Sequence, residues 1–305
     1  MISVLTALFP IACILVLGKS LSALQLLTPA GWIGIERVTY FVLFPALIIG
    51  KLAVADFSNL ELVMPVALVA AQLGLGGASI LMGVLLKQPR ERLGVFVQSA
   101  VRWNTFIALA LAQELMGGAG VALIVVAAAA MIPTANVLSV SALISFSNAR
   151  ANPSYLVRQI AINPLVIACA IGIALNFLPV RIPELAFNTL DLLAQATIAT
   201  GLLTTGAAIQ LKGRTAPIGV VVGWSVLRLV GLPLIAGAIA IALGVSQPVL
   251  LAILIATSVP TASNGTILAR QLGADASLAA NLIACQTVLS LFTISAVLWI
   301  SSAFA

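Results

Sequence analysis

Residues 93–111 read LGVFVQSAVRWNTFIALAL, a stretch whose ends are apolar and whose centre, from Gln98 to Thr105, is polar. As a helix it extends about 28 Å at 1.5 Å per residue, which nearly matches a hydrocarbon layer of about 30 Å. Arg102 lies at mid-depth in this stretch, where a charge is costly and usually faces a cavity or a partner. The stretch therefore predicts a membrane-spanning helix with a polar, functional centre.

The rest of the chain has the same character, because 62% of its 305 residues are hydrophobic and only 7% are charged. Soluble domains carry about 25% charged residues, so lipid must be the solvent of this chain. The apolar runs are continuous rather than alternating, which predicts helices and not barrel strands. We expect an all-α integral membrane protein with ten transmembrane helices, at residues 2–18, 32–55, 61–86, 93–115, 119–147, 158–178, 185–209, 216–243, 248–270 and 276–302.

Several function classes are excluded by what the sequence lacks. It has no histidine, no glycine-rich phosphate loop followed by lysine, and no pair of carboxylates placed for acid–base chemistry. We therefore expect no enzyme activity, no metal site and no cofactor. The net charge of +6 is not gathered into a basic run, so nucleic acid is not an expected partner, whereas membrane lipid is.

The distribution of basic residues between the loops predicts the orientation. Lysine and arginine collect in cytoplasmic loops, and here nine of them fall in the odd-numbered loops against one in the even-numbered loops. We expect a multi-pass protein of the cell (inner) membrane with both termini outside the cytoplasm. The nine are Lys19, Lys87, Arg90, Arg92, Arg150, Arg158, Lys212, Arg214 and Arg270, and the one is Arg181.

Two weak internal similarities share almost the same spacing. A proline followed eight residues later by glycine occurs at Pro10 and again at Pro164, 154 residues on. LAQEL at 111–115 resembles LARQL at 268–272, 157 residues on. The common offset predicts two repeats of five helices each.

The repeats correspond to residues 1–150 and 151–305. An odd number of spans per repeat forces the second half to be inverted relative to the first. Inverted repeats are a common architecture of secondary transporters, whose sites lie near the midplane on discontinuous helices.

A second polar stretch lies at the corresponding place in the ninth helix, where residues 257–266 read TSVPTASNGT. If helices 4 and 9 are both interrupted and cross, their half-helix N-termini offer unpaired amides that suit a carboxylate. The alternative is that Pro260 only kinks helix 9 and its hydroxyls bond back to their own carbonyls. In helix 5, Asn136 either contacts the ligand or joins helices.

The substrate-binding candidates from this reasoning, and from the resemblance described next, are Arg102, Asn104, Thr105, Asn136, Pro260, Thr261, Ser263 and Asn264. Three further residues are candidates for coupling or charge pairing, namely Asp191, Arg228 and Lys51. Arg228 lies near mid-depth in helix 8 and either neutralises Asp191 or Glu36 or contacts the substrate. Lys51 lies near the outer end of helix 2, where it can also be solvated.

These motifs resemble the auxin efflux carrier (PIN-like) family. The resemblance spans the whole chain and is most specific at five segments, 44–47 (FPAL), 102–105 (RWNT), 136–138 (NVL), 260–264 (PTASN) and 269–273 (ARQLG). It implies a scaffold of helices 1, 2, 6 and 7, and a transport domain of helices 3–5 and 8–10 that contains the crossed helices 4 and 9. The folds of bile-acid symporters and sodium/proton antiporters are similar.

The resemblance also implies roles for individual residues. Asn104 and Asn136 would contact a substrate carboxylate, and Pro260 would hold helix 9 open. The family often has a proline in the break of helix 4, whereas residues 107–111 (IALAL) have none, so the sequence leaves the sharpness of that break open. A homodimer through the scaffold helices is expected as well.

The sequence thus predicts a bacterial-type secondary carrier that exports small organic anions, such as auxin-like monocarboxylates, malonate or malate. It would work by alternating access of the elevator kind, and an inside-negative potential would favour anion exit. One alternative is a sodium- or proton-coupled organic-anion symporter, although 260–273 contains no acidic residue for sodium and only Asp191 and Glu114 stand out as proton carriers. Another is a non-transporting membrane subunit or sensor.

Overall fold

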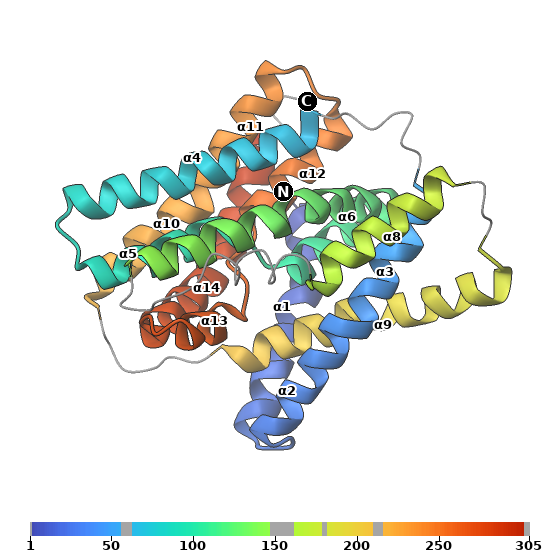
Figure 1. The fold of residues 1–305 in the computed structure, drawn as a ribbon, viewed down its shortest axis with the longest axis horizontal. Helices are drawn as coiled ribbons and strands as arrows, with labels where there is room; N and C mark the ends of the chain where they lie inside the picture. The colour runs from blue at the N-terminus through green and yellow to red at the C-terminus, as the bar shows by residue number, and fades with distance from the viewer. Residues whose placement is uncertain (1, 56–62, 147–161, 179–181, 210–215, 302–305) are drawn as a thin grey trace.

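The structure is a computed structural model, and it describes residues 2–55, 63–146, 162–178, 182–209 and 216–301. Over these ranges it is all-helical and contains no strand (Figure 1). The fold class expected from the uninterrupted apolar runs is therefore confirmed at the level of an all-α protein.

The first half of the chain begins with a long helix and continues through a helix with a π-helical turn. Pro45 has no N–H to donate, and just before it the N–H of Phe44 bonds to the carbonyl of Thr39, five residues back. The elements are α1 (Ile2–Ala23), α2 (Pro29–Val38), η1 (Thr39–Leu43), α3 (Phe44–Ala53), α4 (Val63–Leu85), α5 (Arg90–Val101) and α6 (Thr105–Phe146).

The second half has a similar π-helical turn, which again precedes a proline, Pro233. Its elements are α8 (Pro164–Phe177), α9 (Glu184–Ala208), α10 (Ile218–Val226), η2 (Leu227–Gly231), α11 (Leu232–Ala242), α12 (Gln247–Ser258), α13 (Gly265–Gln271) and α14 (Ala276–Ser301).

α6 consists of two arms, because the chain reverses at Gly117. This glycine has φ 64° and ψ −151°, a conformation that residues with a side chain rarely adopt. The segments before and after Gly117 lie side by side. The amide nitrogen of Gln72 shows this, because it donates to the carbonyls of both Val101 and Met131, at 2.8 and 3.3 Å. The first arm of α6 therefore continues the direction of α5, and the second arm returns beside it.

The helices pack in two groups. The first group contains α1, α2, α3, α8 and α9, and the second contains α4, α5, α6 and α10 to α14 (Figure 1). Within the first group, α1 and α9 approach closely through glycine, since a Cβ at Gly18 would lie 2.2 Å from the Leu203 carbonyl oxygen. The groups meet mainly where α6 contacts α1, α3, α8 and α9.

Within the described residues, six helical segments are long and apolar enough to cross a membrane: Val4–Ala23, Pro29–Ala53, Val63–Leu85, Arg90–Phe146, Ile218–Ala242 and Ala276–Ile300. The 57 residues of Arg90–Phe146 exceed one crossing and reverse at Gly117. α8 and α12 are apolar but shorter. The more detailed prediction of ten spans in a five-plus-five inverted repeat goes beyond these observations and stays a prediction.

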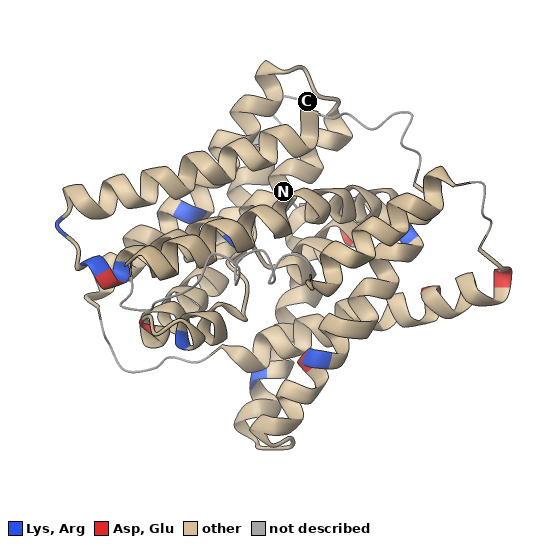
Figure 2. Ribbon diagram, in the orientation of Figure 1, with Lys and Arg blue, Asp and Glu red and all other residues tan. Residues whose placement is uncertain are grey.

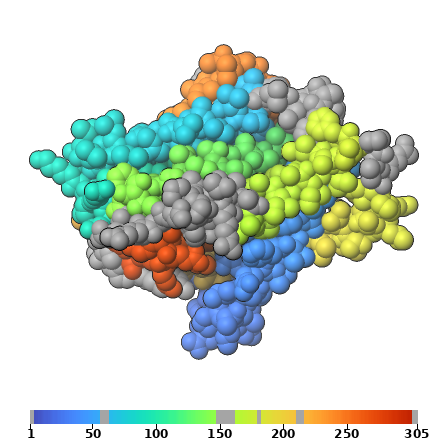
Figure 3. Space-filling view, viewed as in Figure 1, coloured from blue at the N-terminus to red at the C-terminus, as the bar shows by residue number. Residues whose placement is uncertain are grey.

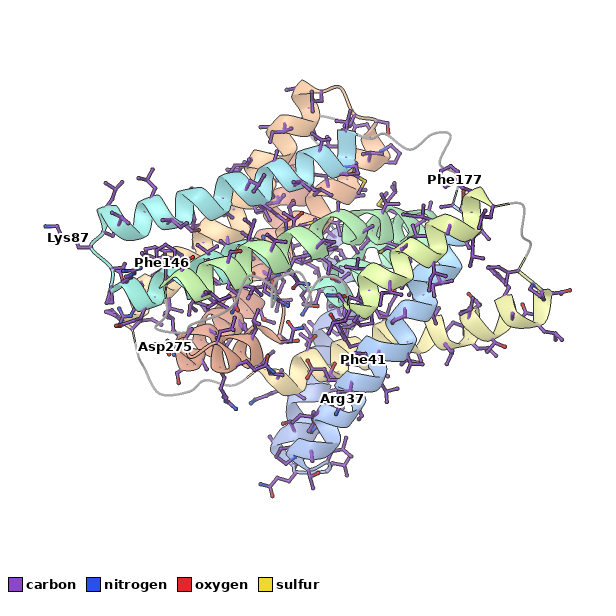
Figure 4. All side chains as sticks on the ribbon, in the orientation of Figure 1. Arg37, Phe41, Lys87, Phe146, Phe177 and Asp275 are labelled. Carbon is purple, nitrogen blue, oxygen red and sulfur yellow. The ribbon has the colours of Figure 1, made fainter. Side chains whose placement is uncertain are left out.

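The outer surface fits a lipid environment. Charged residues are sparse along the helices, and basic residues gather where α4 turns into α5, near Lys87 (Figures 2 and 4). Large apolar side chains such as Phe9, Leu185 and Phe292 are exposed, as expected of a surface that faces lipid. In the loop pattern that predicts orientation, Arg150, Arg158, Arg181, Lys212 and Arg214 lie outside the described residues.

Candidate functional site

The first interruption separates α5 from α6 at residues 102–104. α5 ends at Val101 because Arg102 is extended, with φ −76° and ψ 155°. Asn104 then starts α6: its side-chain oxygen accepts a hydrogen bond from the N–H of Ile107 at 3.2 Å, as a helix N-cap does. An asparagine cap thus provides a sharp break where the sequence has no proline.

The second interruption separates α12 from α13. α12 ends at Ser258, Val259 is extended, and helical structure resumes at Gly265. The two interruptions are in contact, since the backbone N–H of Asn104 donates to the carbonyl of Pro260 at 2.8 Å. The carbonyl of Pro260 is thus free of helical bonding and accepts a hydrogen bond from the first interruption.

Arg102 hydrogen-bonds two of the other predicted residues. Its guanidinium donates to the side-chain oxygen of Asn136 at 3.1 Å and to that of Asn264 at 2.9 Å. Both acceptors are amides, so no carboxylate among the described residues hydrogen-bonds the guanidinium. The Nε–H is buried and has no partner in the described part of the chain.

A cavity of about 80 Å³ lies beside Arg102, between the π-helical segment of the first group and the two interruptions. A water molecule occupies about 30 Å³ of liquid, so the space suits a small solute and not a drug-sized one. Its lining residues are Glu36, Tyr40, Phe44, Arg102, Trp103, Asn104, Thr105, Phe106, Ile132, Ala135, Asn136, Leu165, Ala262, Ser263 and Asn264.

Six of the eight predicted substrate-binding residues line this cavity, and Pro260 and Thr261 do not. Thr261 is buried, and its N–H donates to the side-chain oxygen of Gln286 at 2.9 Å. Asn104 lines the cavity, but its amide nitrogen donates to the hydroxyl of Thr205 at 3.2 Å and so already has a partner. Whether these residues bind substrate stays a prediction.

Arg228 of η2 contacts both interruptions and is completely buried. It donates to the carbonyl of Arg102 from both Nε and Nη2 at 3.3 Å, and to the carbonyl of Thr257 from Nη1. These carbonyls belong to the C-terminal ends of α5 and α12. Each helix end carries about half a negative charge, so the two ends together balance one arginine.

Arg228 therefore has backbone carbonyls as partners where the sequence suggested Asp191 or Glu36. Asp191 accepts a hydrogen bond from Gln195 at 2.9 Å on a solvent- or lipid-exposed part of α9. Lys51 lies in the last turn of α3. Neither Asp191 nor Lys51 lines the cavity.

Buried glutamines complete the crossing. Gln72 donates to the Val101 carbonyl at the end of α5, Gln98 donates to the Gly265 carbonyl at 3.0 Å, and Gln286 accepts from Thr261. A lone glutamine inside an apolar run was the available signal, but it could not identify the partner carbonyls.

Sequence reasoning did not place Glu36, Tyr40 or the indole N–H of Trp103 at the candidate site, although all three residues line the cavity. The indole N–H of Trp103 is buried and, like the Nε–H of Arg102, has no partner among the described residues. Two adjacent residues of the cavity wall thus each carry a buried N–H donor that has no partner among the described residues. Buried donors are nearly always paired, so this pattern favours a ligand with acceptor oxygens.

Comparison with known proteins gives one family. The family model described as "membrane transport protein" matches residues 149–300, a range that includes Arg228 and the second interruption but not Arg102. No curated protein matches the chain.

Proposed function

Because this chain belongs to the auxin efflux carrier family of membrane transport proteins, we propose that it is a secondary carrier of small organic carboxylate anions. The members of the family are transporters and not enzymes, and the chain is a multi-pass membrane protein. The proposal places it in the cell membrane with both termini outside the cytoplasm.

The single observation that carries the substrate class is the pair of unsatisfied donors at Arg102 and Trp103. Arg102 brings a full positive charge, and amide oxygens are its only described side-chain partners. An anion in the cavity would supply both the missing charge and the missing acceptors. A charge-assisted hydrogen bond of this kind is roughly twice as strong as a neutral one.

The neighbouring helix N-terminus supports an anion as well. α6 begins at Thr105, which lines the cavity, so the positive end of its first arm lies beside the same space. The cavity volume of about 80 Å³ favours acids of the size of malonate or malate over bulky ones.

Alternating access is supported by the two packing groups. The cavity lies where they meet, with Tyr40 and Phe44 on one side and Arg102 on the other. The second group, sliding against the first, would carry the bound anion across. An inverted repeat is supported by the last residues of the interrupted helices, Val101 and Ser258, which are 157 positions apart, the offset of one of the sequence repeats.

The test is uptake into proteoliposomes of labelled malonate, malate and indole acetate under an imposed potential. The proposal expects uptake of at least one acid and its loss in Arg102→Ala and Asn136→Ala. Arg37→Ala is the matched control, because Arg37 is exposed on α2. Uptake that is unchanged in both cavity variants would refute the site, and no uptake of any acid by the unchanged protein would refute the substrate class.

A further inference from the structure

A second, larger hollow adjoins the cavity. It measures about 650 Å³ and is lined by the end of α1, by α2, by the end of α9 and by α13. We call it the vestibule. Two residues line both the vestibule and the cavity, namely Glu36 and Ser263. They mark the junction through which a solute would pass from one to the other.

Glu36 lies on α2, the helix that projects from the rest of the molecule (Figure 3), next to the exposed Arg37 that Figure 4 labels. Its side chain is half-buried. Within the described ranges, no side chain forms an ion pair or a hydrogen bond with its carboxylate. A carboxylate at the mouth of an anion cavity repels the anion unless its charge is removed or balanced.

The charged and titratable groups around Glu36 are few. In the cavity they are Arg102 and Tyr40, the latter from η1, and in the vestibule Arg270 from α13. Lys19 of α1 donates to the Ile209 carbonyl at 2.7 Å.

α9 also packs against α2, but its acids are remote. α9 lines the vestibule with Thr204, Ala207 and Ala208. Asp191 precedes Thr204 by 13 residues, or about 20 Å of helix, and Glu184 is farther still. No other carboxylate of the described residues lines either space.

The charge of Arg102 can be balanced by one negative group at a time. With the cavity empty, ionised Glu36 and Arg102, which line the same space, leave the site without net charge. When an anion binds Arg102, Glu36 shares the cavity with a second negative charge, which favours its protonated form. With a monoanion, the site is then neutral both empty and loaded, and a neutral site crosses a low-dielectric layer at the lowest cost.

We propose that Glu36 is the proton-coupling group of this carrier, releasing a proton when the cavity empties and binding one when the anion enters. The proton joins a carboxylate oxygen of Glu36 from water in the vestibule and leaves to water on the other side of the membrane, and no other bond changes. The inference rests on the proposed function and adds to it that the anion moves together with a proton. A monoanion then moves without net charge, and a dianion moves with one negative charge.

Glu36→Gln tests this directly, because glutamine resembles the protonated acid and cannot release a proton. Proteoliposomes that contain the unchanged protein are loaded with a pH indicator and given labelled malonate, or malate if that acid is taken up faster. Uptake of the acid should bring protons into the vesicles. In the variant, exchange of labelled for unlabelled acid should persist, because the loaded carrier still crosses. Accumulation driven by a proton gradient should fall about tenfold or more.

The matched control is Glu114→Gln, which removes an exposed carboxylate of α6 and should leave both rates unchanged. Equal loss of exchange and of gradient-driven uptake in Glu36→Gln would indicate a merely structural role and overturn the inference. Acid uptake by the unchanged protein without proton movement would also overturn it and leave the proposed function intact. If the unchanged protein takes up no acid at all, the proposed function falls and this inference falls with it.

Discussion

Two arginines contact the same crossing and differ in their surroundings. Arg228 is completely buried and donates to the carbonyls that end α5 and α12. Arg102 lines a cavity, donates to two amide oxygens and keeps an unsatisfied N–H. The comparison teaches that helix ends can balance a buried arginine without any acidic side chain, and that Arg102 has no such helix-end partners among the described residues.

The largest expected effect comes from removing the structural arginine. Arg228→Ala leaves the carbonyls of Arg102 and Thr257 without their partner inside the protein. An unsatisfied buried polar group costs about 1–3 kcal/mol, so we expect a loss of roughly 3 kcal/mol or more and the loss of transport. Thermal melting of the purified protein measures it. Arg37→Ala should melt like the unchanged protein, and an equally small effect of Arg228→Ala would contradict the assignment.

The second variant separates function from stability at the other arginine. Arg102→Gln keeps a hydrogen-bonding side chain but removes the charge, so transport should fall about tenfold to a hundredfold while stability changes by about 1 kcal/mol. The initial rate of labelled acid uptake and the melting temperature give the two numbers. A large drop in melting temperature with proportional loss of uptake would place Arg102 in the same structural class as Arg228.

A smaller effect is expected at the cap that makes the first break. Asn104→Ala loses the N-cap of α6 and the bond to Thr205, which we expect to cost about 1 kcal/mol. Asn104→Asp keeps the capping oxygen and serves as the control. Melting of both variants checks this, and equal destabilisation by Asp and Ala would show that the cap contributes little.

The smallest expected effect is at the indole beside Arg102. Trp103→Phe keeps an aromatic ring but removes an unsatisfied buried N–H, so the melting temperature should stay the same or rise slightly. If the N–H bonds the anion, the concentration for half-maximal uptake should rise by about fivefold, or about 1 kcal/mol. Unchanged uptake kinetics would assign the N–H no role in binding.

The sequence located the two interruptions well, and the reason is local. Gln98 to Thr105 is polar inside an apolar run, and Pro260 cannot donate a helical hydrogen bond. The structure ends helices at Val101 and Ser258, inside these stretches. The sequence has no proline in the first interruption and therefore did not show how sharp this break is. The break is capped by Asn104, and this cap depends on the backbone geometry there.

The pairing of charges was much harder to predict. The sequence suggested an acidic partner for Arg228, but its partners are the backbone carbonyls of Arg102 and Thr257. Every residue has a backbone carbonyl, so the sequence could not identify these two. Glu36 was considered only as that partner. Its place on the wall of the cavity depends on how the first group of helices packs against the second, over separations of many residues.

The sequence by itself determined that this chain lives in a membrane as helices, since composition fixes which solvent a surface can face. It also determined its family and the positions where its helices break. Only the tertiary structure decided which arginine is balanced by helix ends and which one lines a cavity, and that Glu36 shares that cavity with Arg102. The physical reason is that solvation preferences are properties of local residues, whereas the balance of charge depends on helix ends that meet only after folding.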